Sequence, residues 1–310
     1  MEARFTVLAS GSSGNAALLE ASGFGLLIDC GLAPRALSHR LAAIGSSWKA
    51  VHAVILTHTH SDHWKDATLA HLRSLRVPLF AHQAHLDEIQ RAPSFESLHR
   101  AKLARPYRSG EALPLGPALT CRPIPVPHDA EPTFAFRIDL HDGTDTPLAS
   151  LGHASDLGVA PPGLADEFAG VDLLAVEYNH DVQMQKNSGR PSHLIRRVLG
   201  DQGHLSNVQA AEFTRDVIAK SGTAGPRVLV QLHLSRQCNT PELAIAAGRK
   251  ALADQSVTIV TAQQDVPARS IMLTPTHPSA RSTTRSTVIA SETPRGPRFH
   301  YQPQLPGFGV

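Results

Sequence analysis

Three histidines and one aspartate stand within six residues, 58–63, which read His-Thr-His-Ser-Asp-His and directly follow a short apolar run. Side chains two residues apart on an extended chain point to the same side, so His58 and His60 can bind one ion together. Asp62 and His63 come where the chain turns towards a helix, and they can face a second ion. Imidazole nitrogens and carboxylate oxygens are ligands for zinc, manganese and iron. The spacing therefore favours a two-metal centre over a single structural zinc or a solvated histidine-rich loop.

The composition of the chain fits a folded protein with a sizeable core. Hydrophobic residues make up 42% of the 310 residues, enough for one large domain or two small ones. No run approaches the ~18 apolar residues of a membrane span, and the first residues lack the pattern of a signal peptide. The widely spaced Cys30, Cys121 and Cys238 suit reduced thiols better than a disulfide framework. We therefore expect a cytoplasmic protein that does not enter a membrane.

Short apolar stretches and helical periods alternate along the chain. Strands are expected at 4–9, 16–21, 24–29, 51–57, 78–82, 119–126, 133–140, 147–152, 171–178, 227–232 and 257–261. Helices are expected after Pro34, after Asp66 and at 84–91, 206–220 and 241–253. Strands with interspersed helices predict sheets covered by helices, an α/β (α+β) fold. No linker-like composition interrupts residues 1–268, so we expect one catalytic domain there.

The last residues, 269–310, differ in composition from the rest of the chain. Residues 271–310 hold four arginines against one glutamate, which gives this segment +3 and leaves about −1 for the body, since the total is +2. The segment is rich in Ser, Thr and Pro and has no sustained period. It therefore cannot bury enough apolar surface to offset its ordering entropy. We predict a disordered basic tail that either helps to hold a polyanion or has no function.

The hexapeptide resembles the HxHxDH signature of the metallo-β-lactamase fold. Three longer stretches narrow the resemblance: Val7–Asn15 (VLASGSSGN), Gly203–Asn207 (GHLSN) and Leu232–Ala244 (LHLSRQCNTPELA). Together they resemble the YycJ/WalJ-like branch, bacterial proteins related to tRNase Z and RNase J and regarded as DNA exonucleases. The resemblance extends from about residue 4 to about residue 265. It implies a four-layer αββα sandwich with the metal ions at the ends of the sheets.

The resemblance also implies how the first ion is held. His128, which ends an extended apolar stretch, completes a set of three with His58 and His60. Asp156 is implied as a carboxylate that bridges both ions, with one oxygen on each. The family usually has a threonine beside this aspartate, where this chain has a serine. His153 lies three residues away and competes for the role, but we favour Asp156 because a bridging ligand needs two oxygens.

The second ion is expected to bind Asp62, His63 and a ligand from the last third of the chain. The resemblance implies His233 as that ligand, and its place after a strongly apolar stretch, instead of within one, argues against a buried core histidine. The resemblance makes Asp29 a carboxylate that orients the ligand histidines or supports Asp62, since a ligating histidine usually donates its other ring N–H. Cys30 is interpreted as a small buried residue and not as a soft metal ligand.

His204 stands in a Gly-His-Leu-Ser context. In tRNase-Z-like relatives such a histidine lies close to the scissile phosphate, and its proposed role is to protonate the leaving oxygen. Imidazole titrates near neutral pH and can supply that proton, although a structural role stays open. Glu177 is expected to pair with His204 and tune its pKa. The Ser10–Asn15 turn is interpreted as a tight hairpin turn, with phosphate binding by its backbone as the alternative.

The expected function is that of a two-metal-dependent phosphodiester hydrolase, a 5′–3′ DNA exonuclease of DNA repair that uses two zinc or manganese ions. Asp62, His204 and Glu177 are the expected catalytic residues. The alternative is a small-molecule hydrolase on the same site, a cyclic phosphodiesterase or a thioesterase. His204 favours phosphodiesters, because a thiolate leaves without a proton, whereas the near-neutral body argues against tight polyanion binding. A non-catalytic scaffold fits poorly with seven candidate ligands. RNA as substrate, endonuclease action and protein partners stay open.

Overall fold

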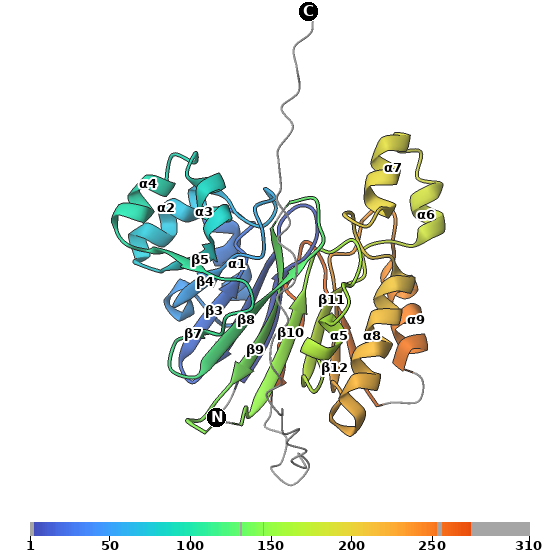
Figure 1. Ribbon diagram of the computed structural model, residues 1–310. Coiled ribbons are helices and arrows are strands. Elements are labelled where there is room, and N and C mark those ends of the chain that lie inside the picture. Colours follow the sequence, from blue (N-terminus) through green and yellow to red (C-terminus); the bar gives the residue numbers. More distant parts are fainter. Residues whose placement is uncertain (1–2, 131, 145, 253–255, 274–310) are drawn as a thin grey trace, which may run out of the picture.

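Two seven-stranded β-sheets pack face to face in the centre of the chain, and helices cover both outer faces (Figure 1). The computed structural model describes residues 3–130, 132–144, 146–252 and 256–273. The first sheet has the strand order β14-β1-β2-β3-β4-β5-β6. Its strands are β1 (Ala3–Ala9), β2 (Ala16–Ala21), β3 (Phe24–Ile28), β4 (Ala53–Ile55), β5 (Leu79–His82), β6 (Ala104–Tyr107) and β14 (Ile271–Leu273).

The second sheet has the strand order β13-β12-β11-β10-β9-β8-β7. Its strands are β7 (Leu113–Leu115), β8 (Leu119–Val126), β9 (Thr133–Leu140), β10 (Ala149–Ala154), β11 (Leu173–Glu177), β12 (Val228–Leu232) and β13 (Thr258–Thr261). The helices are α1 (Pro34–Ala43), α2 (Asp66–Leu75), α3 (Gln83–Ile89), α4 (Phe95–Arg100), α5 (Leu164–Glu167), α6 (Val182–Lys186), α7 (Ser192–Leu199), α8 (Asn207–Ser221) and α9 (Pro241–Leu252), with short 3-10 turns at Trp48–Ala50 and Gly222–Ala224.

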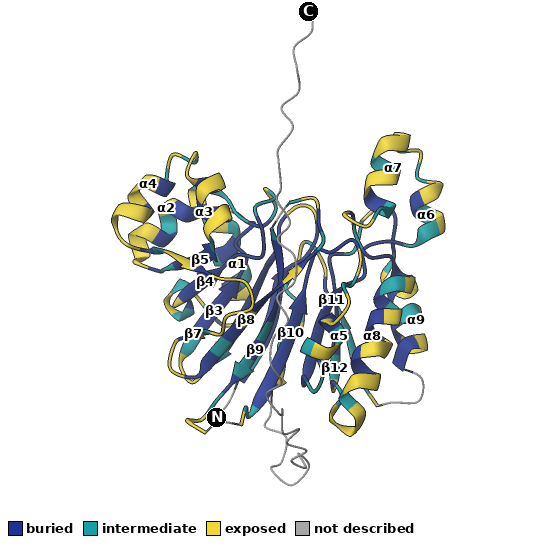
Figure 2. Cartoon of the chain, viewed as in Figure 1, coloured by how far each residue is buried: buried dark blue, intermediate teal, exposed yellow. Residues whose placement is uncertain are grey.

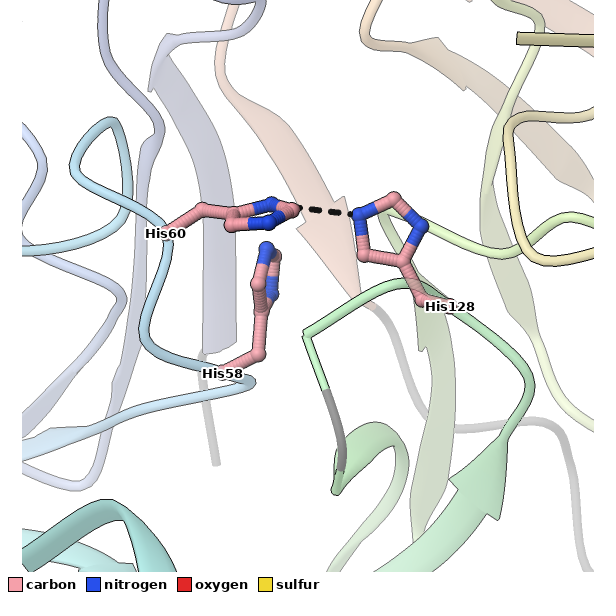
Figure 3. A group of neighbouring side chains, drawn as sticks. All are labelled: His58, His60 and His128. Carbon is pink, nitrogen blue, oxygen red and sulfur yellow. Dashed lines mark hydrogen bonds between the residues drawn. The ribbon is translucent and has the colours of Figure 1, made fainter. Parts of the chain in front are cut away.

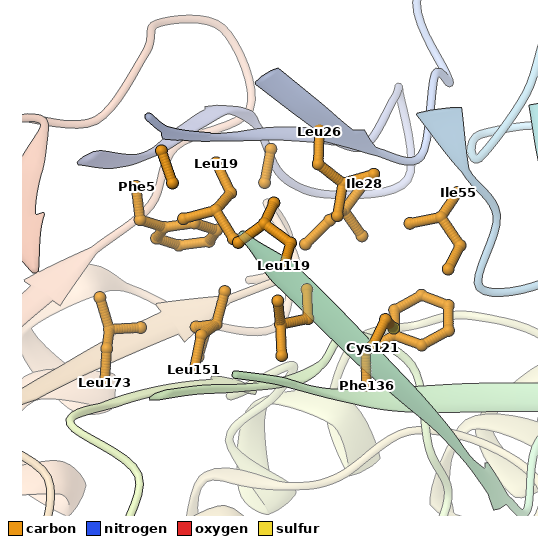
Figure 4. Packing of buried hydrophobic residues seen from close by; sticks show 14 of the residues in the cluster. Phe5, Leu19, Leu26, Ile28, Ile55, Leu119, Cys121, Phe136, Leu151 and Leu173 are labelled. Carbon is orange, nitrogen blue, oxygen red and sulfur yellow. The ribbon is translucent and has the colours of Figure 1, made fainter. Parts of the chain in front are cut away.

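Successive side chains of a strand bury opposite faces of the first sheet, as the pleat of a strand requires. In β3, Leu26 and Ile28 enter the core between the two sheets, whereas Leu27 packs under the helices. Figure 4 shows the central core, where Phe5 and Leu19 of the first sheet approach residues of the second, such as Leu151 and Leu173. Because both faces of the central strands are covered, most of their residues are buried, whereas the edge strands β6, β7, β13 and β14 also contain exposed or half-buried residues (Figure 2). This double burial explains the continuous apolar runs in the sequence.

Two groups of helices cover the outer faces of the sandwich. Helices α1 to α4 bury Leu37, Leu69 and other apolar side chains against the first sheet. Helices α5, α8 and α9 do the same on the second sheet, where Phe213 of α8 is buried. Helices α6 and α7 stand beyond the strand ends, across from α2 to α4 (Figure 1). The predicted four-layer αββα sandwich is therefore confirmed.

The strands that lead to the motif residues end at one edge of the sandwich. In the first sheet β3, β4, β5 and β6 run parallel, and in the second β10, β11, β12 and β13 do so. Carboxyl ends of parallel strands meet at the same sheet edge, where loops can gather functional side chains. The chain leaves β4 at Ile55, earlier than the predicted strand 51–57, and residues 56–63 form a loop at this edge.

The structure corrects the predicted start of the tail. We expected residues 269–310 to lie outside the folded domain, but Ile271–Leu273 form β14 and pair antiparallel with β1. Three residues of strand are too short for a period to be visible in the sequence. The rest of the expected tail, 274–310, lies outside the described residues. Several short elements were not predicted either: α4, α5, α6, α7, β6 and β7.

Three loops interlock at the edge that carries the motif residues. The amide of Asn15 donates to the Asp62 carbonyl oxygen (2.7 Å), and the amide of Gly31 donates to the Asn15 carbonyl oxygen (2.9 Å). The amide of Cys30 donates to the His63 carbonyl oxygen (2.8 Å). A Cβ atom at Gly31 would lie 1.7 Å from the Asp62 carbonyl oxygen. Only glycine fits there, because the two backbones touch.

We predict that Gly31→Ala lowers the free energy of unfolding by about 1–3 kcal/mol or more, since the added methyl group must push two backbones apart. Urea unfolding of metal-free protein measures this. Gly225→Ala is the matched control, because the nearest atom to a Cβ there is 3.9 Å away. Equal stability of the two variants would show that the backbone contact at Gly31 is not needed.

Candidate metal centre

The candidate ligands follow the ends of four strands that lie far apart in the sequence. His58, His60, Asp62 and His63 follow β4, His128 follows β8, Asp156 follows β10, and His233 follows β12. Glu177 is the last residue of β11, and His204 lies in the loop before α8. The structure thus brings the predicted site residues together at one edge of the sandwich.

His58, His60 and His128 form the first group of donors (Figure 3). One ring nitrogen of each lies within 4.8 Å of the others, and His60 Nδ1 is 3.2 Å from His128 Nε2. The Nδ1–H of His128 donates to the carbonyl oxygen of Gly203 (2.8 Å), which leaves Nε2 as the nitrogen that faces the group. Burial lowers the pKa of His128 and, with the nearby His63, of His58. Both rings are therefore neutral, the state that binds metal ions.

Asp156 joins the second and third groups of donors. One group is Asp156 with His58 and His63, and the other is Asp156 with Glu177, His204 and His233. The carboxylate is 2% exposed, and its Oδ2 lies 2.6 Å from His63 Nε2 and 3.7 Å from His58 Nε2. Its Oδ1 pairs with His233 Nδ1 and lies 3.5 Å from His204 Nδ1. Neither oxygen has the geometry of a regular hydrogen bond. Buried carboxylate oxygens need a partner. Together with the buried, unpaired Nε2 atoms of His58 and His233, they fit a centre for divalent cations.

Asp62 is close to the second set of ligands but does not belong to any of the three tight groups of described residues. Its Oδ2 lies 3.7 Å from both His63 Nε2 and His233 Nε2. Two donors about 2.1 Å from one ion can be this far apart. Asp62 is thus within reach of an ion bound by either of these two rings. Asp62 also accepts a hydrogen bond from Asn15 Nδ2 (3.2 Å).

Asp29 holds His63, as the sequence predicted for a supporting carboxylate. Its Oδ2 lies 2.8 Å from His63 Nδ1, and Oδ1 accepts the amide hydrogen of Thr57 (2.8 Å). The second ring nitrogen of His63 then points to Asp156. Burial alone would lower the pKa of His63, but Asp29 and Asp156 outweigh it and raise the pKa to about 10. A metal ion at this ring would release the proton.

Two residues of the site, each directly after a strand, have a positive φ angle, which L-residues rarely adopt. Asp29 has φ 59° and His233 has φ 54°. The amide of His233 donates to Ser10 Oγ (2.8 Å), and its carbonyl oxygen accepts from Asn179 Nδ2 (3.0 Å). Strained residues of this kind persist where the surroundings hold them, most often at functional sites. The hydrogen bonds therefore fix the ring of His233 towards the centre.

Glu177 and His204 form the expected pair. Oε1 of Glu177 lies 2.7 Å from His204 Nδ1 and 2.9 Å from His233 Nδ1, and Oε2 accepts the amide hydrogens of Leu157 and Leu205. Burial alone would lower the pKa of His204, but Glu177 and Asp156 outweigh it and raise the pKa to about 9. His204 therefore carries a proton in the metal-free protein, held by the buried Glu177 carboxylate.

The residues weighed as alternatives lie outside the donor groups of the described chain. His153 is buried in β10, and burial lowers its pKa to about 4, which keeps the ring neutral. Burial raises the pKa of the Cys30 thiol, so it does not form a thiolate. The Ser10–Asn15 turn is closed by local hydrogen bonds, since Asn15 Oδ1 accepts from the Gly11 amide (2.8 Å). Besides its bond to Asp62, Asn15 Nδ2 also lies 2.9 Å from His63 Nε2.

The centre lies at the floor of a pocket of about 270 Å³. Its lining residues are Ser12, His60, Ser61, Asp62, Asp156, Arg197, His204 and His233. Sequence reasoning missed Ser10, Ser12 and Asn15 as parts of the site, although the Ser/Gly-rich turn was a visible signal. Among the described helices, none combines the length and apolar character needed to span a bilayer.

Known proteins resemble this chain in both sequence and structure. The chain is 28% identical over 241 residues to exodeoxyribonuclease WalJ of Streptococcus pneumoniae. The aligned region covers 78% of this chain and 85% of WalJ. It is also 28% identical over 246 residues to exodeoxyribonuclease YycJ of Bacillus anthracis, covering 79% and 87% of the two chains. The metallo-β-lactamase fold protein YhfI of Bacillus subtilis superposes with a TM-score of 0.61 at 18% identity, covering 88% of this chain and all of YhfI.

The expected resemblance to the YycJ/WalJ-like branch is therefore confirmed over most of the chain. The family model described as the Beta-lactamase superfamily domain matches residues 25–234. This match includes all seven candidate ligands and the Glu177–His204 pair. By this match and by its αββα fold, the chain belongs to the β-lactamase superfamily, with a metallo-β-lactamase fold.

Proposed function

We propose that this chain is a two-metal-dependent nuclease that degrades DNA from the 5′ end and acts in DNA repair. The observation that carries the proposal is the position of Asp156, a buried carboxylate that touches both histidine groups. Its Oδ2 lies near His58 and His63, and its Oδ1 lies near His204 and His233, so the carboxylate is placed between the ligands of both proposed ions. Two relatives that are similar over most of their length are named exodeoxyribonucleases, which supports DNA as the substrate.

Two divalent ions at these ligands would lower the pKa of a water molecule and neutralise charge on the phosphate oxygens. His58, His60 and His128 would hold the first ion, and Asp62, His63 and His233 would hold the second, with Asp156 between them. Zinc and manganese both suit this set of imidazoles and carboxylates.

His204 is the proposed proton donor to the leaving oxygen. Its Nδ1 faces the Glu177 carboxylate, so Nε2 is the ring nitrogen that can donate into the pocket that His204 lines. A carboxylate behind the ring fixes its orientation and keeps it protonated. An alkoxide leaving group needs such a proton, whereas a thiolate does not. The Glu177–His204 pair therefore favours a phosphodiester over a thioester as substrate.

The proposal is tested by degradation of 5′-phosphorylated DNA, with RNA and a cyclic phosphodiester assayed alongside, in manganese or zinc. We predict shortening of DNA from the 5′ end by the wild type, and its loss on chelation and in Asp156→Asn. The variant keeps the size of the side chain but removes the charge that a bridging ligand supplies. Asp166→Asn is the control, because Asp166 lies exposed on α5 and pairs with Lys220.

Equal rates in Asp156→Asn and the control would contradict the metal centre. Cleavage of the cyclic diester with no action on DNA or RNA would keep the centre and replace the substrate by a small molecule. Shortening from the 3′ end, or internal cuts, would overturn the proposed direction and mode of attack.

We predict that His204→Gln slows DNA cleavage by about 10²–10⁴-fold in kcat, the usual contribution of a general acid. The p-nitrophenyl ester of thymidine 5′-phosphate should lose much less, because nitrophenolate leaves without a proton. His193→Gln is the control, since His193 is an exposed histidine on α7. An equal loss of kcat on both substrates would contradict proton donation by His204 and indicate a structural role.

A further inference from the structure

The pocket above the metal centre has one basic side chain that the proposed chemistry does not use. Arg197 stands in the last turn of α7 and lines the pocket. Among the described residues that line it, no other lysine or arginine is present. The same pocket contains the carboxylates of Asp62 and Asp156, which repel an anionic substrate wherever metal ions do not neutralise them. Arg197 therefore gives the pocket wall a positive charge that does not depend on the protonation of a histidine.

Asp129 connects Arg197 to the first group of histidines. Asp129 Oδ2 accepts a hydrogen bond from Arg197 Nε, and Oδ1 lies 3.4 Å from His60 Nε2 and 3.5 Å from His128 Nε2. This hydrogen bond holds Arg197 next to the centre through its Nε.

The two Nη groups of the Arg197 guanidinium can bind a further partner. Among the described residues, none accepts a hydrogen bond from either Nη of Arg197, and the side chain is 55% exposed. Arginine has five N–H donors in a planar fork, and the fork matches two oxygens of a phosphate. A guanidinium anchored by Nε is already oriented, so less rotamer entropy is lost when the fork binds.

We propose that Arg197, held by Asp129, binds one phosphate of the substrate strand through its two Nη groups. This inference rests on the proposed function, because it assigns a recognition residue to the same phosphodiester substrate. It makes Arg197 a binding residue that sets substrate affinity, and Asp129 the residue that positions it. Such a contact reads the backbone and not the base, so it applies to every sequence.

The first test measures the affinity of the metal-loaded protein for a 5′-phosphorylated phosphorothioate oligonucleotide by fluorescence anisotropy. A hydrogen-bonded charge pair contributes about 1.5–3 kcal/mol, so Arg197→Gln should weaken binding by about 10- to 100-fold. Arg197→Lys, which keeps the charge but loses the fork, should fall between. Metal content should stay at the wild-type value in both variants, and KM should change far more than kcat.

Arg196→Gln is the matched control. Arg196 directly precedes Arg197 on the same helix and has the same charge. It is exposed and does not line the pocket. We expect its affinity to change less than about threefold, because a surface charge outside the pocket contributes little. Equal weakening by Arg196→Gln and Arg197→Gln would overturn the proposal, since only the net charge of α7 would then matter.

A second test locates the contact on the substrate. Each phosphate near the 5′ end is replaced in turn by an uncharged methylphosphonate, and binding is measured with wild type and Arg197→Gln. The proposal predicts one position at which the wild type loses affinity and the variant does not, the pattern of a directly interacting pair. Losses that are the same in both proteins at every position would contradict a direct contact.

These outcomes are distinguishable from failure of the proposed function. If the wild type binds and cleaves no nucleic acid but cleaves a small diester, the DNA substrate is wrong. The phosphate contact then predicts that Arg197→Gln still raises KM for the small diester by about tenfold or more relative to Arg196→Gln. An unchanged KM in that case would overturn the contact as well.

Discussion

The site depends on a carboxylate that lies almost fully buried at one edge of the sandwich. Asp156 is 2% exposed, and neither oxygen makes a regular hydrogen bond. Removing such a group from water costs several kcal/mol unless positive charge compensates. In the metal-free protein the neighbouring carboxylates raise the pKa of His63, His204 and His233, so protons on these rings offset the charge of Asp156. Divalent cations can replace these protons, and the donor groups on both sides of Asp156 suit a pair of such ions.

Strained backbone conformations and close backbone contacts at one edge of the sandwich hold the ligands around Asp156. Parallel strands deliver the ligands to the same edge, and the left-handed backbones of Asp29 and His233 turn their side chains towards the centre. The contact between Gly31 and the Asp62 carbonyl sets the loop that carries the hexapeptide. Rigid support of this kind is what a site with several ligands from distant segments needs.

Local patterns predicted the strands, the helices and the ligands of the hexapeptide, whereas the resemblance to the YycJ/WalJ-like branch implied the four-layer sandwich and the more distant ligands His128, Asp156 and His233. Alternating apolar residues such as Leu26 and Ile28 predict strands, and the spacing of the hexapeptide places its histidines on one loop. Contacts between distant segments were not predictable in this way. The bond from Asn15 to Asp62 and the bridge from Arg197 through Asp129 to the histidines exist only after the sheets pack. The pairing of β14 with β1 joins residues more than 260 positions apart, and no local period reveals it.

The number of metal ions per chain tests the two-metal account most directly. The protein is loaded with manganese or zinc, separated from free metal by gel filtration, and measured by mass spectrometry of the metals against protein concentration. The account predicts two ions per chain in the wild type and a clear loss in Asp156→Asn, because the shared carboxylate holds both. A single ion in the wild type, or two ions in the variant, would contradict it.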